Sequence, residues 1–180
     1  DGTSVGPGAA RGHPPVQPRR TLVLGGARSG KSVEAERMLA GEPAVTYVAT
    51  ARPLDDDPEW AERVAMHRRR RPTTWRTVET RDVAAVIRNA ETPVLVDCLT
   101  LWLADAMEAG DHSARVDELV SAWRDARTRV VAVTNEVGSG VVPGTPQGRA
   151  FRDELGRLNA RVAAESEAAL LVVAGRVVPL

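Results

Sequence analysis

The sequence is poor in cysteine and in aromatic residues, and it has no long apolar run. Its single cysteine, Cys98, excludes an intrachain disulfide framework and a metal site built from several cysteines. Aromatic residues make up only 3% of the chain, too few for the stacking platform of a single-strand nucleic-acid binder. No apolar stretch approaches the roughly 20 residues that span a bilayer, and the N-terminal region lacks the apolar centre of a signal peptide. We therefore expect a cytoplasmic protein with no membrane span.

An excess of charge of either sign is also missing. The chain has 24 basic and 24 acidic residues, so its formal net charge of zero gives no global attraction to nucleic acid or to an anionic membrane. We expect no nucleic-acid partner. With 180 residues, of which 43% are hydrophobic, the chain is long enough for one domain with a substantial core. Residues 1–20 are rich in Gly and Pro, which predicts a flexible tail followed by a single domain over residues 21–180.

A phosphate-binding pattern follows the first apolar run of the chain. Residues 22–24 lead into a glycine, and after four further residues come Gly30, Lys31 and Ser32, which is the spacing of a P-loop. Glycine lets successive backbone N–H groups converge on an anion, lysine brings positive charge to the outer phosphates, and the hydroxyl suits Mg²⁺. A helix that begins here aims its N-terminal dipole at the same phosphates. The pattern predicts a nucleoside triphosphate site formed by Gly25, Gly26, Ala27, Arg28, Ser29, Gly30, Lys31 and Ser32.

Apolar runs alternate with helical patterns along the rest of the chain. This alternation predicts an α/β fold with a mainly parallel sheet and helices on both faces, as in a P-loop NTPase. The expected strands are 22–24, 45–49, 75–78, 93–96, 130–134, 169–174 and 177–179. The expected helices are 32–40, 58–69, 82–89, 99–107, 114–127 and 145–165, with a connector at 110–113.

Polar residues follow several of these strands. In open parallel sheets, ligands bind outside the carboxyl ends of the strands. Asp97 ends the buried run at 93–96, the position from which a P-loop protein holds Mg²⁺ opposite the loop hydroxyl, so we predict Ser32 and Asp97 as metal ligands. Thr50 and the pair Asn135 and Glu136 also follow strands, and the pattern assigns no role to Glu136.

A histidine and four consecutive arginines end the helix predicted at 58–69 and extend just beyond it. The residues alone allow the arginines at 68–71 to be a nucleic-acid patch or a solvated helix end whose charges suit the helix dipole. His67 falls on the same helix face as Trp60 and Val64, so it is either a functional side chain or a histidine packed on a half-buried face.

Five segments together resemble one known family. They are GGARSGKS at 25–32, YVAT at 47–50, RVAMHRRRRPTTWRTVE at 63–79, VLVDCLTLW at 94–102 and VTNEVGSGVVP at 133–143. The likeness is to the bifunctional adenosylcobinamide kinase and adenosylcobinamide-phosphate guanylyltransferase family, and it runs from about residue 20 to the C-terminus. The histidine-to-glutamate stretch and the NEVG segment are more specific than the loop. One departure is that residues 55–60 are slightly longer than usual in the family.

The resemblance implies two reactions of cobalamin biosynthesis. Adenosylcobinamide is phosphorylated with ATP or GTP, and GMP then passes from GTP to adenosylcobinamide phosphate through a GMP-histidine intermediate, giving adenosylcobinamide-GDP. The family histidine maps onto His67, which with Lys31 would be catalytic. The resemblance also implies a RecA-like sheet and a homotrimer. Family nucleotide contacts beyond the loop map onto Thr50, Ala51, Arg68, Arg69, Arg70, Arg71, Glu79 and Asp97.

The residue types suit these roles. Neutral imidazole is a competent nucleophile near pH 7, and neighbouring arginines stabilise charge that builds on a transferring phosphate. An ionised Glu79 can accept hydrogen bonds from a guanine edge or a ribose hydroxyl, or it is an exposed strand-end glutamate. Two other functions stay open: a single-activity P-loop kinase acting on a small molecule, which does not need His67, and a non-catalytic GTP-binding module.

Overall fold

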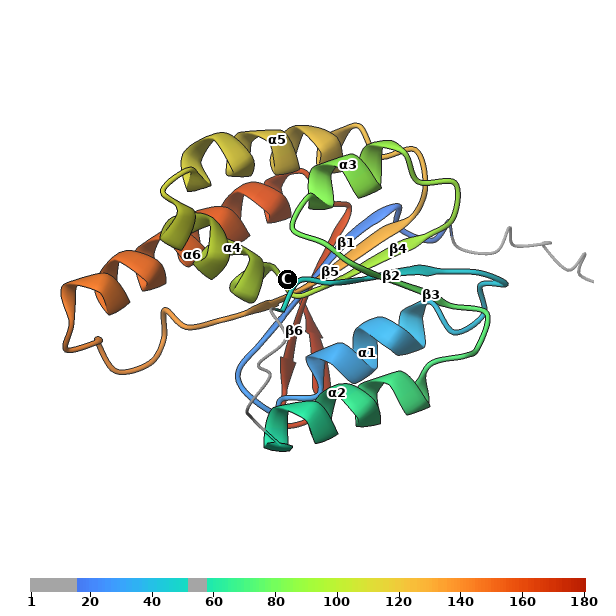
Figure 1. Cartoon of the computed structure of the whole chain (residues 1–180), viewed down its shortest axis with the longest axis horizontal. Helices are drawn as coiled ribbons and strands as arrows, with labels where there is room; N and C mark the ends of the chain where they lie inside the picture. The colour runs from blue at the N-terminus through green and yellow to red at the C-terminus, as the bar shows by residue number, and fades with distance from the viewer. Residues whose placement is uncertain (1–15, 52–57) are drawn as a thin grey trace, which may run out of the picture.

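The protein is a three-layer α/β structure built around one sheet (Figure 1). The structure is a computed structural model, and it describes residues 16–51 and 58–180. The sheet has the strand order β3-β2-β4-β5-β1-β6-β7, and only the β6–β7 pair is antiparallel. The strands are β1 (Arg20–Gly25), β2 (Thr46–Ala49), β3 (Arg76–Glu79), β4 (Val94–Asp97), β5 (Val130–Asn135), β6 (Ala168–Val173) and β7 (Arg176–Pro179). The helices in the described part are α1 (Lys31–Met38), α2 (Pro58–Arg70), α3 (Val83–Arg88), α4 (Leu99–Ala109), α5 (His112–Arg124) and α6 (Pro146–Ala164).

The central strands are buried on both faces, which explains their uninterrupted apolar sequences. Figure 1 shows α3, α4, α5 and α6 on one face of the sheet and α1 and α2 on the other. The first face carries the larger core, with Trp123 fully buried, and the second holds a smaller core around Leu39 and Trp75. Every parallel strand therefore ends at the same edge, where the predicted polar residues come together.

Helix ends follow local chemistry. The Asp82 side chain caps α3 by accepting a hydrogen bond from the Ala85 N–H, and the Thr145 hydroxyl caps α6 by accepting one from the Gly148 N–H. At the end of α4, Gly110 has a φ of 79°, the left-handed conformation that glycine adopts without strain. These short signals explain why sequence alone placed the helices well.

The predicted α/β, P-loop fold class is confirmed, and the ends of the helices and strands lie within three residues of their predicted positions. Helix α5 begins at His112, so the connector predicted at 110–113 is shorter than expected. Strand β1 begins at Arg20, the last residue of the predicted tail, and most of that tail lies outside the described residues. No helix in residues 16–51 and 58–180 is long and apolar enough to cross a membrane. The single cysteine is free and buried.

An ion pair fixes the start of β1 to the start of β6. The Arg20 backbone N–H donates to Glu167 Oε2 at 2.6 Å, and the Arg20 Nε donates to Oε1 at 3.1 Å. Hydrogen bonding to the Arg20 side chain lowers the pKa of Glu167 to about 2 from an ordinary value of 4.5. The pair joins two strands that are far apart in sequence but adjacent in the sheet.

Replacing this carboxylate should change how stability depends on pH. Because the folded-state pKa is depressed, the contribution of Glu167 is fully present above about pH 4.5 and is lost as pH falls toward 2. The side chains are 23% and 41% exposed, so we expect Glu167→Gln to lower the free energy of unfolding by about 1 kcal/mol at pH 7. Urea unfolding from pH 7 to pH 2 measures this, and the difference from wild type should vanish at the acid end. The exposed Glu91→Gln serves as control and should show no such pH-dependent difference.

Candidate active site

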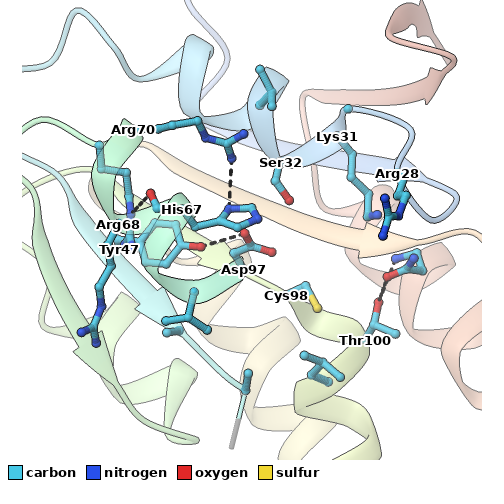
Figure 2. Close-up of a pocket in the computed structure, with 18 of the residues that line it drawn as sticks. Arg28, Lys31, Ser32, Tyr47, His67, Arg68, Arg70, Asp97, Cys98 and Thr100 are labelled. Carbon is cyan, nitrogen blue, oxygen red and sulfur yellow. Dashed lines mark hydrogen bonds between the residues drawn. The ribbon is translucent and has the colours of Figure 1, made fainter. Parts of the chain in front are cut away.

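A cavity of about 570 Å³ lies at the carboxyl ends of the parallel strands, between the loop after β1 and helix α2. Figure 2 shows its side chains converging from both sides. Most predicted site residues line it: Ala27, Arg28, Ser29, Gly30, Lys31, Ser32, Ala51, His67, Arg68, Arg70, Arg71, Glu79 and Asp97. The predicted residues Gly25, Gly26, Thr50 and Arg69 do not line it. The structure thus brings the P-loop and the histidine helix to one cavity.

The loop has the backbone conformation that its glycines allow. Gly30 has a φ of 97°, which favours glycine, and it immediately precedes the first residue of α1. The Lys31 ammonium donates to the Gly26 carbonyl at 2.9 Å, and burial lowers the pKa of Lys31 although the nearby Asp97 opposes this effect. The turn between β6 and β7 supports the loop from behind, since the Gly175 N–H donates to the Ser29 carbonyl at 2.8 Å. The lysine is therefore held at the loop.

Gly25 does not face the cavity, but it is needed where it stands. A Cβ at this position would lie 2.3 Å from Ser29 Oγ and 2.8 Å from the Val172 carbonyl oxygen, and the second of these is backbone. We expect Gly25→Ala to lower the free energy of unfolding by about 1–3 kcal/mol and to weaken nucleotide binding, because the loop must shift. Thermal unfolding and nucleotide titration measure the two effects.

The matched control is another glycine-to-alanine change. Gly156 lies within α6, where an added methyl group would meet no other part of the protein within 4 Å and where φ is not positive. Gly156→Ala should raise the free energy of unfolding by about 0.5–1 kcal/mol and leave nucleotide binding unchanged, because alanine favours the helix. Equal stability of the Gly25 variant and wild type would contradict the steric argument.

Asp97 and Ser32 reach the cavity from β4 and from α1. The Tyr47 hydroxyl donates to Asp97 Oδ2 at 2.7 Å, and burial beside that carboxylate raises the pKa of Tyr47, so the phenol stays a donor. Figure 2 marks this hydrogen bond with a dashed line. Mg²⁺ prefers oxygen ligands and often uses one or two protein groups together with nucleotide phosphates and water. A hydroxyl and a carboxylate lining one cavity fit that requirement.

His67 also lines the cavity, on the helix that faces the loop across it. Its side chain is 35% exposed, and its Nδ1 lies 3.1 Å from Arg70 Nη2 and 3.7 Å from Glu36 Oε1. The ring is therefore open to the cavity and not enclosed in the core. Of the two neighbours suggested by the helical pattern, Val64 lines the cavity as well, and the side chain of Trp60 lies outside the described part of the structure.

The four arginines have different positions. Arg68 Nη2 pairs with Glu79 Oε1 at 2.7 Å, and the Arg71 guanidinium stacks 3.6 Å from the centre of the Tyr47 ring. Arg71 Nε also donates to the His67 carbonyl at 3.0 Å. Arg69 points elsewhere, with a contact of 3.4 Å to the Ala65 carbonyl of its own helix. Three of the four arginines thus border the cavity, as a site for a phosphorylated ligand requires.

Two predicted polar residues serve the backbone instead of the cavity. The Thr50 hydroxyl is buried, donates to the Cys98 carbonyl at 2.7 Å and accepts from the Cys98 N–H at 2.9 Å. Glu136 Oε1 accepts from the Gly138 N–H at 2.7 Å and thereby closes a turn after β5. Both side chains stabilise the backbone just after a strand. The sequence pattern of polar residues after strands therefore includes them although they do not line the cavity.

Sequence reasoning did not assign several cavity residues. Tyr47 lies within the YVAT segment, and Thr77 and Thr100 line the cavity from β3 and α4. Asn135 was expected at this edge, and its side chain accepts from the Thr100 hydroxyl at 2.9 Å. The signal available in the sequence was that these residues lie within three positions of a strand end. That position alone does not distinguish residues that line the cavity from residues whose side chains hydrogen-bond to the backbone.

Comparison with known proteins gives consistent matches. Residues 21–180 match the family model described as cobinamide kinase / cobinamide phosphate guanyltransferase. The bifunctional adenosylcobalamin biosynthesis protein CobP of Pseudomonas aeruginosa is 42% identical over 169 residues, covering 89% of this chain and 96% of that protein. The corresponding CobU proteins of Salmonella typhimurium and Escherichia coli are 38% and 39% identical, and each match covers 86% of this chain and 95% of the relative.

Solved structures support the fold. An ATPase from the type III secretion system of pathogenic bacteria superposes with a TM-score of 0.57 at 11% identity, over 85% of this chain and 50% of the ATPase. At this identity the likeness concerns the fold alone.

Proposed function

Because the chain belongs to the cobinamide kinase / cobinamide phosphate guanyltransferase family, and is a bifunctional enzyme of cobalamin biosynthesis, we propose that both of its reactions use the cavity described above. Its first substrate is adenosylcobinamide, whose hydroxyl receives the γ-phosphate of ATP or GTP. Its second is adenosylcobinamide phosphate, which receives GMP and becomes adenosylcobinamide-GDP. The observation that carries the proposal is that His67 and the P-loop line one cavity.

His67 is the nucleophile of the second reaction. An imidazole nitrogen attacks the α-phosphorus of GTP, the bond from that phosphorus to the bridging oxygen breaks, and pyrophosphate leaves with the electron pair. A phosphate oxygen of the second substrate then attacks the same phosphorus, and the histidine nitrogen leaves. Two displacements replace one difficult reaction between anions. The partly exposed ring, which lines the same cavity as the phosphate loop, supports this role.

The nucleotide is held through its phosphates. The backbone N–H groups of the loop and the Lys31 ammonium bind the outer phosphates, and Arg68, Arg70 and Arg71 neutralise charge on the opposite wall of the cavity. Ser32 and Asp97 would hold Mg²⁺, which would neutralise negative charge on the triphosphate when bound. Glu79 accepts hydrogen bonds from the guanine edge or the ribose, with Arg68 holding its carboxylate in place.

Labelling with GTP separates the two-activity proposal from a kinase without guanylyl transfer. The protein is incubated with GTP carrying the label in its α-phosphate, without cobinamide phosphate. We expect one label per chain that survives alkali and is lost in acid, as a phosphoramidate is. The label should then pass to adenosylcobinamide phosphate when this is added. A chain that phosphorylates adenosylcobinamide but retains no label would be a kinase alone, and one that binds GTP without turnover would be a binding module.

The proposal extends to assembly and location. We propose a homotrimer in the cytoplasm, as the likeness to the family implies. Exposed apolar side chains on and beside the edge strand β7, Val177, Val178 and Leu180, support burial against other chains. Sedimentation velocity of the full chain should give the mass of three subunits, and a monomer at micromolar concentration would contradict this part of the proposal.

A further inference from the structure

One buried carboxylate oxygen next to the histidine has no hydrogen-bond partner. Glu36 lies on α1, its side chain is 13% exposed, and its Oε1 atom is buried without any hydrogen bond. The same atom is 3.7 Å from His67 Nδ1 and 3.6 Å from Arg70 Nη2, distances at which neither contact is a hydrogen bond. By contrast Glu34, two residues earlier, is engaged by Arg37 through two hydrogen bonds. A buried carboxylate oxygen that has an arginine within ion-pair distance but makes no hydrogen bond calls for an explanation.

The contact between Arg70 and His67 fixes the proton on the ring. A guanidinium can only donate, so Nδ1 must accept at 3.1 Å with its lone pair, and the proton of the neutral ring then lies on Nε2. In this arrangement neither ring nitrogen has a free lone pair for attack on a phosphate. This geometry assigns the neutral ring to the Nε2–H tautomer, with Arg70 as the partner of Nδ1 (Figure 2).

We propose that Glu36 is a positioning residue for His67: once Arg70 turns from the ring to the triphosphate, the Glu36 carboxylate accepts a hydrogen bond from Nδ1–H and leaves Nε2 free to attack. This inference rests on the proposed role of His67 as nucleophile. A carboxylate that accepts from one ring nitrogen fixes both the tautomer and the orientation of an imidazole. Closing the gap from 3.7 Å needs only a small shift between α1 and the end of α2.

The charges and protons balance through the step. Before attack the ring exchanges its Nε2 proton for one on Nδ1 through water, with no net change. Nε2 then bonds to the α-phosphorus, the bond to the bridging oxygen breaks, and pyrophosphate carries away the electron pair. The ring becomes positively charged and keeps its Nδ1 proton, so a carboxylate at Nδ1 stabilises that charge. Arg70 at Nδ1 would oppose it, which is why it must leave.

The tautomer can be observed directly. The chain has three histidines, so a ¹⁵N spectrum of histidine side chains in the full-length protein is simple to assign. The probe is a GTP analogue with a methylene group between the α- and β-phosphates, which cannot release pyrophosphate. We expect the His67 proton on Nε2 in the free protein and on Nδ1 with the analogue bound. Persistence of the Nε2–H form with the analogue bound would overturn the inference.

Kinetics provide the second readout. Glu36→Ala should lower the single-turnover rate of label transfer from GTP to the protein about 100-fold, with the KM for GTP and the rate of ATP-dependent kinase turnover within about twofold of wild type. Glu34→Ala, on the same helix, is the matched control and should leave the labelling rate unchanged. A labelling rate of the Glu36 variant within threefold of wild type, or an equal fall in kinase rate, would overturn the positioning role.

The two proposals fail in different ways. If His67→Ala still acquires an acid-labile label, the proposed nucleophile is wrong and the role of Glu36 falls with it. If His67→Ala takes no label and Glu36→Ala is labelled like wild type, only the positioning role is wrong.

Discussion

His67→Ala should abolish guanylyl transfer while the kinase reaction continues. Removal of a covalent nucleophile leaves no group to carry GMP, so we expect the transfer rate to fall by about 10⁴-fold or more. The kinase step transfers a γ-phosphate directly to the hydroxyl of its substrate and should keep at least about a third of its rate. The measurements are acid-labile labelling by α-labelled GTP and initial rates of adenosylcobinamide phosphorylation with ATP.

The control for this variant is a second histidine. His112 begins α5, on the other face of the sheet from the histidine helix, and does not line the cavity. His112→Ala should leave both activities and the acid-labile label unchanged. Equal loss of both activities in the His67 variant, with unfolding temperature preserved, would contradict the assignment, because it would mean that the ring serves nucleotide binding in general.

Lys31→Ala should damage both activities. Each reaction begins with a bound triphosphate, and the lysine supplies a positive charge at the loop where no other ammonium group is available, since Lys31 is the sole lysine of the chain. We expect kcat/KM to fall by about 10³-fold or more for the kinase and for guanylyl transfer alike. Steady-state kinetics with each nucleotide measure the loss.

The uniqueness of this lysine offers a direct check. An amine-acylating reagent should modify only the α-amino group and Lys31, and bound nucleotide should protect Lys31, which mass spectrometry of the digested protein can quantify. Arg37→Ala removes a positive charge from the exposed side of the same helix and serves as control. Retention of full kinase activity by Lys31→Ala would remove the central support for the loop as the nucleotide site.

The elements of the fold could be predicted because their signals are local. A continuous apolar run such as residues 94–96, or a cap such as Asp82, is decided by neighbours in sequence. The P-loop likewise needs only one strand, one turn and one helix. The predicted start of α5 was late because Asp111 precedes it without a side-chain cap, so the local signal for a helix start was weak.

The finer arrangement of the site depends on contacts that no local pattern encodes. Tyr47 and Asp97 are fifty positions apart, and only the parallel pairing of β2 with β4 brings them together. Glu36 and Glu34 look alike in sequence, yet one faces the histidine and the other an exposed arginine. Thr50 was expected in the cavity because ligands bind at the carboxyl ends of parallel strands. Its hydroxyl instead hydrogen-bonds to the backbone N–H and carbonyl of Cys98.

The bond from Gly175 to Ser29 links the phosphate loop to the last hairpin of the sheet. The ribosome synthesises that hairpin after the loop. The loop therefore gains its hydrogen bond from Gly175 only when β6 and β7 have paired with the rest of the sheet. Nucleotide affinity should therefore appear late during synthesis, and triphosphate in the cell should favour chains that have finished folding over those that have not.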